Sequence, residues 1–131
     1  MEDLFYFTKS ALTLQDFWKI AEREGHQCKI HEYPNGPALH IYYSDRGFWQ
    51  CVKTSEEQGD YDSFEPSEYA LVADYQPASS FVISYHTVSV NSLALLLKIV
   101  LTEYGGWLGS DENNFEPIYT VDNIDSLHAL S

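Results

Sequence analysis

One strongly apolar helix, followed by two glycines, constrains the fold of this chain more than any other feature. The apolar positions that share one face of this helix are Leu93, Leu96, Leu97, Val100 and Tyr104. Leu95, Ile99 and Leu101 occupy most of the remaining circumference. We therefore expect a helix over about Ser92 to Tyr104 that is covered on two sides. Ser89 or Asn91 can cap its start, and Gly105 permits a left-handed end.

A second helix is predicted over Leu14 to Glu24. Thr13 is its expected N-cap, Asp16 stands three residues later, and Gly25 ends the pattern. A shorter helix is expected over Val121 to Leu130, beginning near Asp122.

Strand patterns account for much of the remaining chain. The expected strands are Leu4 to Thr8, Gln27 to Tyr33, Ala38 to Ser44, Phe48 to Lys53, Phe81 to Tyr85 and Glu116 to Thr120. The segment Ser44 to Gly47 has the composition of a hairpin turn, so the strands on either side of it should pair. The sequence thus predicts a single α+β domain over residues 1–131, with an antiparallel sheet of five to seven strands and two principal helices packed on it.

Charge is distributed unevenly along the 131 residues, whose net charge is −13. Residues 1–53 contain six Lys and Arg against seven Asp and Glu, whereas residues 54–131 contain one Lys against thirteen acids. A surface of one sign repels nucleic acid and anionic membranes and accelerates encounter with a basic partner. Acidity that serves solubility alone is the alternative interpretation.

The most acidic segment is the stretch of about residues 54–68, which carries six carboxylates and no base. Its glycine and proline predict an exposed loop within the domain, because periodic structure resumes at Tyr69 to Tyr75. Loops of this length often carry function.

The expected location is the cytoplasm. The N-terminus lacks the features of a signal peptide, and the longest apolar run, Leu93 to Leu97, is much shorter than a membrane span of roughly 20 residues. Cys28 and Cys51 are expected to be reduced thiols, although a bridge between them remains open.

Catalytic, metal and cofactor motifs are weak, and we expect a protein that is not an enzyme and binds neither metal nor cofactor. The histidines show no helical or finger spacing, and both cysteines lie in apolar strand patterns that favour inert thiols. The acids at 60–65 and 111–114 lack the glycine and terminal glutamate of an EF-hand loop. Gly105, Gly106 and Gly109 form no phosphate-binding loop.

An acidic surface with aromatic anchors is the remaining kind of site. Trp107 follows two glycines and precedes Asp111 and Glu112, a position that suits an exposed aromatic contact; burial of Trp107 beneath the apolar helix is the alternative, and it is slightly favoured. Tyr61 stands within the acidic loop and adds amphipathic contact area.

The segments Tyr104 to Asp111, YGGWLGSD, and Phe115 to Tyr119, FEPIY, together resemble the end of small acidic bacterial immunity proteins of polymorphic toxin and contact-dependent growth inhibition systems. The resemblance implies a cytosolic protein without enzymatic activity that binds a cognate toxin domain and blocks its active site. Such toxins are often basic nucleases, which agrees with the charge.

The leading hypothesis is therefore a binding protein that neutralises a basic protein partner, and it involves neither nucleic acid nor membrane. Its predicted contact residues are Asp60, Tyr61, Asp62, Glu65, Trp107, Asp111 and Glu112. One alternative is a nucleic-acid mimic that inhibits a DNA- or RNA-binding protein. Another is a small hydrolase or metal enzyme built on His31, His40 and His86.

Overall fold

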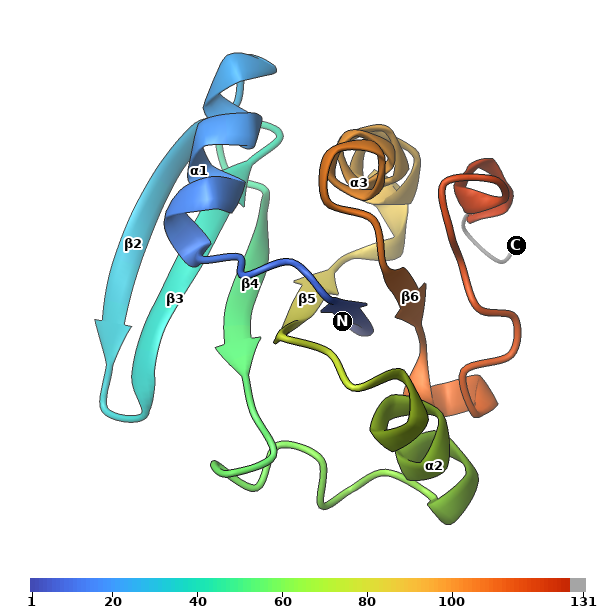
Figure 1. Ribbon diagram of the computed structural model, residues 1–131. Helices are drawn as coiled ribbons and strands as arrows, with labels where there is room; N and C mark the ends of the chain where they lie inside the picture. The colour runs from blue at the N-terminus through green and yellow to red at the C-terminus, as the bar shows by residue number, and fades with distance from the viewer. Residues whose placement is uncertain (128–131) are drawn as a thin grey trace.

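The computed structural model describes residues 1–127 of the chain. Six strands form one antiparallel sheet in the order β2-β3-β4-β5-β1-β6 (Figure 1). The strands are β1 (Glu2–Thr8), β2 (Gln27–Tyr33), β3 (Gly36–Tyr42), β4 (Phe48–Thr54), β5 (Ser79–Tyr85) and β6 (Trp107–Gly109). The helices are α1 (Leu14–Arg23), α2 (Pro66–Tyr75) and α3 (Val90–Tyr104), with short 3-10 turns η1 (Thr87–Ser89), η2 (Asp111–Asn113) and η3 (Ile124–Ser126). The predicted α+β fold is confirmed.

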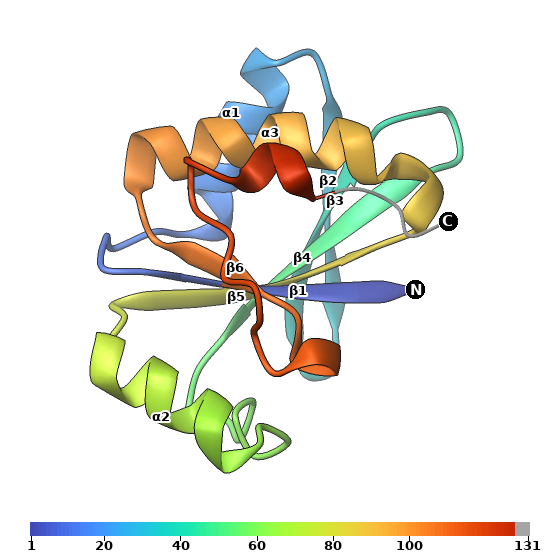
Figure 2. The ribbon, with the colours of Figure 1, turned by 90° about the vertical axis from the view of Figure 1, so that its right-hand side faces the viewer.

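The three helices lie on both faces of the sheet. α1 and α3 cover one face and α2 lies against the other (Figures 1 and 2). The larger core forms between the sheet and the pair α1 and α3, and it is built from side chains such as Tyr6, Ile41, Trp49, Phe81 and Leu97. The sheet thus has a thick apolar layer on one face and a separate, smaller layer on the other.

The start of α1 confirms its predicted cap. The Thr13 hydroxyl accepts a hydrogen bond from Asp16 N at 3.3 Å, and the Asp16 carboxylate accepts one from Thr13 N at 2.8 Å. This reciprocal capping box gives the Thr13 and Asp16 amides side-chain acceptors at the start of the helix. The helix then buries Leu14, Phe17, Ile20 and Ala21 against the sheet.

α3 is the apolar helix on which the fold depends. The stretch Thr87–Tyr104 is long and apolar enough to cross a membrane by length and composition alone, with a mean hydropathy of 1.3. Leu93, Leu97 and Val100 are each 1% exposed within the larger core, so packing on the sheet accounts for much of this apolar character. Ser89 precedes the helix and accepts a hydrogen bond from the buried Trp49 Nε1 at 2.9 Å.

The first strand lies inside the sheet between two strands from the second half of the chain. β1 pairs over its whole length with β5, and its Phe5 to Phe7 stretch pairs with β6. Gly106 makes this second pairing possible. It has a φ of +93°, and a Cβ there would lie 2.2 Å from the Phe7 carbonyl oxygen.

Two expectations for the C-terminal part of the chain are wrong. Residues 116–120 form no strand; only Tyr119 pairs, through an isolated bridge to Leu108, and Pro117 has no amide hydrogen to donate to a ladder. β6, to which Tyr119 bridges, is the edge strand on this side of the sheet. Within 121–130, the described part forms turns and the short η3 rather than a continuous helix, and residues 128–131 lie outside the described part.

Candidate functional site

The acidic segment and α2 form a layer on the face of the sheet opposite α3. A second hydrophobic cluster joins this layer to the sheet. Phe5 and Phe7 point from β1 into it, where they meet Phe64 from the loop and Phe115 from the turn after η2. This cluster holds the loop before α2 and the loop after β6 on the same side of the molecule (Figure 2). Two acidic segments that are distant in the sequence therefore share one layer.

Most of the predicted acids in this layer reach solvent. Asp62, Glu65 and Glu112 are exposed, and Asp60 is half-exposed. Asp60 also shapes the loop, because its carboxylate accepts a hydrogen bond from Ser55 N at 2.8 Å. Glu65 is the N-cap of α2 and takes part in a capping box. Asp111 begins η2, and its side chain lies outside the described part of the structure.

The two predicted aromatic contacts need correction, because both side chains are buried. Tyr61 is 9% exposed, and its hydroxyl donates to Ser80 Oγ at 2.7 Å. Trp107 is 7% exposed and packs on Phe7 with ring centroids 4.7 Å apart. Trp107 therefore lies within the second cluster, on the opposite face of the sheet from the apolar helix α3. Neither residue offers surface to a partner in this structure.

Other apolar side chains take the exposed positions of this layer. Tyr69 is 42% exposed and Leu71 is 39% exposed, both on α2. The Tyr69 hydroxyl donates a hydrogen bond to the Glu56 carboxylate, and this bond raises the pKa of Tyr69. The buried residues of α2 are Glu68 and Val72, and Tyr69 lies three residues before Val72, so helical spacing alone does not identify Tyr69 as exposed.

The acidic surface consists of the exposed or half-exposed carboxylates Glu56, Glu57, Asp60, Asp62, Glu65, Asp74 and Glu112. Residues 54–85 and 107–127 contain no Lys or Arg. Lys98 lies on α3, where it pairs with Asp125 at 3.0 Å. Lys9 reaches the edge of the α2 layer, with Nζ 5.0 Å from the centre of the Tyr75 ring. The negative charge on the α2 side is therefore poorly compensated by neighbouring bases.

No protein-family model matches the chain, and comparison with curated proteins and with solved structures gave no match.

The half of the sheet not covered by α2 presents a stack of aromatic and histidine rings. His40 on β3 lies between His31 and Phe48, with ring centroids 4.2 and 4.1 Å away. Its Nε2 lies 3.2 Å from Gln50 Oε1. Desolvation lowers the pKa of His40, and the neighbouring His31 lowers it further. The stack favours neutral, closely packed rings rather than a charged site.

The structure brings only two of the three histidines of the enzyme hypothesis together. His86 is exposed beyond the end of β5, and within residues 1–127 it has no recorded contact with the ring of His31 or His40. No group of three or more His, Cys, Asp or Glu side chains in that range is arranged to hold a metal ion.

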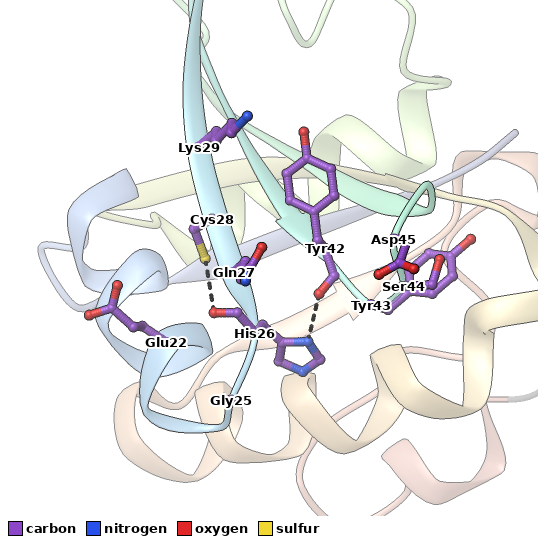
Figure 3. Close-up of a pocket in the computed structure, with 10 residues that line it drawn as sticks. All are labelled: Glu22, Gly25, His26, Gln27, Cys28, Lys29, Tyr42, Tyr43, Ser44 and Asp45. Carbon is purple, nitrogen blue, oxygen red and sulfur yellow. Dashed lines mark hydrogen bonds between the residues drawn. The ribbon is translucent and has the colours of Figure 1, made fainter.

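A hollow of about 760 Å³ lies between the α1–β2 turn and the β3–β4 turn (Figure 3). His26 and Cys28 line it, and His26 Nδ1 lies 3.0 Å from Tyr42 O. Burial, assisted by Glu22, raises the pKa of Cys28 to about 11, so this thiol is a poor nucleophile at neutral pH. Cys28 and Cys51 are both free thiols.

Proposed function

We propose that this protein binds and neutralises a basic protein, and that the partner class is a toxin nuclease domain, as the resemblance to immunity proteins implies. The observation that supports this most is the acidic surface. Its carboxylates come from two segments that the second hydrophobic cluster holds in one layer. A concentrated field of one sign steers a partner of opposite charge and fixes its orientation.

Tyr69 and Leu71 supply apolar contact area within this surface, in place of the buried Tyr61 and Trp107. An exposed tyrosine buries much area on binding and loses little side-chain entropy. Asp62, Asp74 and Glu57 are exposed, and within residues 1–127 their carboxylates form no recorded hydrogen bond or ion pair, so they are the acids to change first. Asp60 and Glu65 stabilise the loop and α2, and changing them would also alter the fold.

The nucleic-acid mimic is less well supported, because α2 does not present a row of carboxylates. Within α2, Asp74 is exposed but Glu68 is 1% exposed, and Glu68 Oε1 accepts a hydrogen bond from Glu65 N at 2.7 Å. A mimic needs regularly spaced negative groups that replace the phosphates of a strand.

The test requires a basic protein that binds the wild-type chain in stoichiometric amount at low salt. The wild-type chain must also inhibit the activity of that protein. A triple variant with Glu57→Gln, Asp62→Asn and Asp74→Asn should associate with that partner about tenfold more slowly at low ionic strength. The difference should shrink at roughly 0.5 M salt, where the screening length is a few ångströms. Stopped-flow association kinetics provide the measurement.

The matched control carries Glu24→Gln, Glu32→Gln and Asp45→Asn, three exposed acids outside the α2 layer. It changes the net charge by the same amount and should associate at close to the wild-type rate. Equal slowing in both triple variants would contradict a role for this surface. Failure of any basic protein to be retained and inhibited would contradict the proposed function itself.

A further inference from the structure

A hollow of about 540 Å³ lies on the α3 side of the sheet, beside the start of β1. The end of β5, the first residue of α3 and the turns η2 and η3 enclose it. Its apolar wall includes Leu4, Val90 and Leu127, which belong to the larger core. Its polar lining includes Glu2, Tyr85, Glu112 and Tyr119. This hollow is thus polar on one side and apolar on the other.

The register of the sheet places a carboxylate beside a phenol in this hollow. Glu2 of β1 stands directly opposite Tyr85 of β5 in the antiparallel ladder. Residues opposite each other in such a ladder point to the same face, with their Cβ atoms about 5 Å apart. Both side chains therefore lie on the face of Leu4, beneath the start of α3.

Tyr85 is a buried side chain with an unused hydrogen-bonding group. It is only 8% exposed, yet within residues 1–127 no hydrogen-bond partner of its hydroxyl is recorded. Glu68 Oε2 is the one fully buried side-chain atom without a partner in that range, so the Tyr85 hydroxyl retains access to the space beside it. A buried polar group is normally paired, and an unpaired hydroxyl that opens into a hollow is available to a ligand.

The field in this hollow favours a cation. None of the described residues that line it is Lys, Arg or His. Burial raises the pKa of Tyr85 to about 12, with further contributions from Glu2, Tyr119, Glu112 and Asp3. These contributions show that several negative groups act on the same point. Lys98 on α3 and Arg23 on α1 pair instead with Asp125 and Glu103.

We propose that this hollow receives the guanidinium group of an arginine side chain. A guanidinium presents five donors in a planar fork, which suits carboxylate and phenol oxygens that converge from several elements. Leu4, Val90 and Leu127 would cover the methylene groups, and the Tyr85 and Tyr119 rings add cation–π attraction. The arginine belongs to the basic partner, so this inference rests on the proposed function; Glu112 connects the hollow with the acidic surface.

The first test uses N-acetyl-arginine amide, titrated into the protein and followed by NMR, because it probes the hollow without a partner protein. Shifts confined to Tyr85 and its neighbours and a dissociation constant on the order of 1 mM are expected. Tyr85→Phe and Glu2→Gln should each weaken binding severalfold, whereas Tyr42→Phe and Glu32→Gln, which lie outside the hollow, should not. The matching citrulline derivative has nearly the same shape without the charge and should not bind.

Equal binding of the citrulline derivative, or equal loss in the control variants, would overturn the proposal. Thermal unfolding of each variant separates loss of the hollow from loss of the fold. With the partner protein, Glu2→Gln and Tyr85→Phe should accelerate dissociation. A partner that binds both variants normally would overturn the arginine site while the proposed function stands. If the arginine derivative binds but no basic protein is retained and inhibited by the chain, the site is supported and the proposed function is contradicted.

Discussion

His40 shows how neighbouring rings alone can bury a side chain on the surface of a sheet. It is 4% exposed, although α1 lies on the other face of β2, β3 and β4 and no helix within residues 1–127 covers the face that carries His40 (Figure 1). His31 and Phe48 stack on its two sides, and Gln50 lies at hydrogen-bond distance from its Nε2. The alternation of the hairpin sequence predicted that His40 and Tyr42 share a face, but it could not show that the rings exclude water from one another.

Acidification should destabilise the protein through His40. Its folded pKa lies below the ordinary value of 6.5, so as the pH falls through 6.5 the unfolded chain gains a proton that the folded chain does not. Stability is therefore lost below about pH 6.5, and the loss levels off below the folded pKa of His40. Urea unfolding between pH 8 and pH 5 should show a smaller loss in a His40→Phe variant, which keeps a ring in the stack. An NMR titration midpoint of His40 at or above 6.5 would contradict this expectation.

At the scale of elements, the sequence predicted the helices and turns whose stabilising contacts lie within a few residues of one another. The Thr13 and Asp16 cap and the turn before β4 are encoded within a few residues, and α1 and the β3–β4 hairpin formed as expected. β6 is only three residues long and depends on β1, about 100 residues earlier in the chain. No pattern within Trp107–Gly109 could predict it, because its stability comes from partners distant in sequence.

Gly106 should be the glycine least tolerant of substitution around β6. Gly106→Ala places a methyl group against the Phe7 carbonyl and adds the strain of a φ of +93°. Gly25→Ala is the matched control, because Gly25 has the same φ of +93° but nothing within 4 Å of an added Cβ.

The control should lose about 1 to 2 kcal/mol of unfolding free energy and Gly106→Ala about 3 kcal/mol or more. Chemical denaturation measures both values. Equal losses of unfolding free energy in the two variants would show that the close approach of Gly106 to β1 does not add to the destabilisation.

At the scale of the whole molecule, many acids of the second half of the sequence gather in the layer that contains α2. The sequence predicted the amount and sign of the charge. It could not predict which aromatic residues of the acidic segments stay exposed, because burial of Tyr61 and Trp107 depends on Phe5 and Phe7 of a distant strand. Tyr69 is not a member of that cluster and is 42% exposed.

Repulsion within the acidic surface should limit stability at low salt. The net charge is −13, and like charges held in one layer destabilise the compact state. The triple variant Glu57→Gln, Asp62→Asn and Asp74→Asn should therefore melt a few degrees higher than wild type in about 10 mM salt, and this gain should fall in about 0.5 M salt. The triple control on Glu24, Glu32 and Asp45 should gain less. Differential scanning calorimetry measures these melting temperatures. Equal gains in the two triple variants would show that the repulsion does not come from the acidic surface.

The position of β1 between β5 and β6 also determines when β1 can pair with its neighbours during synthesis. The strands β2, β3 and β4 adjoin one another in the sheet and can pair as soon as Thr54 has left the ribosome. The apolar first strand has no neighbour until Ser79–Tyr85 is made, and its second neighbour arrives only with Gly109. Until Tyr85 has been made, the nascent chain therefore carries β1 as an unpaired apolar segment, which is the kind of segment that favours aggregation.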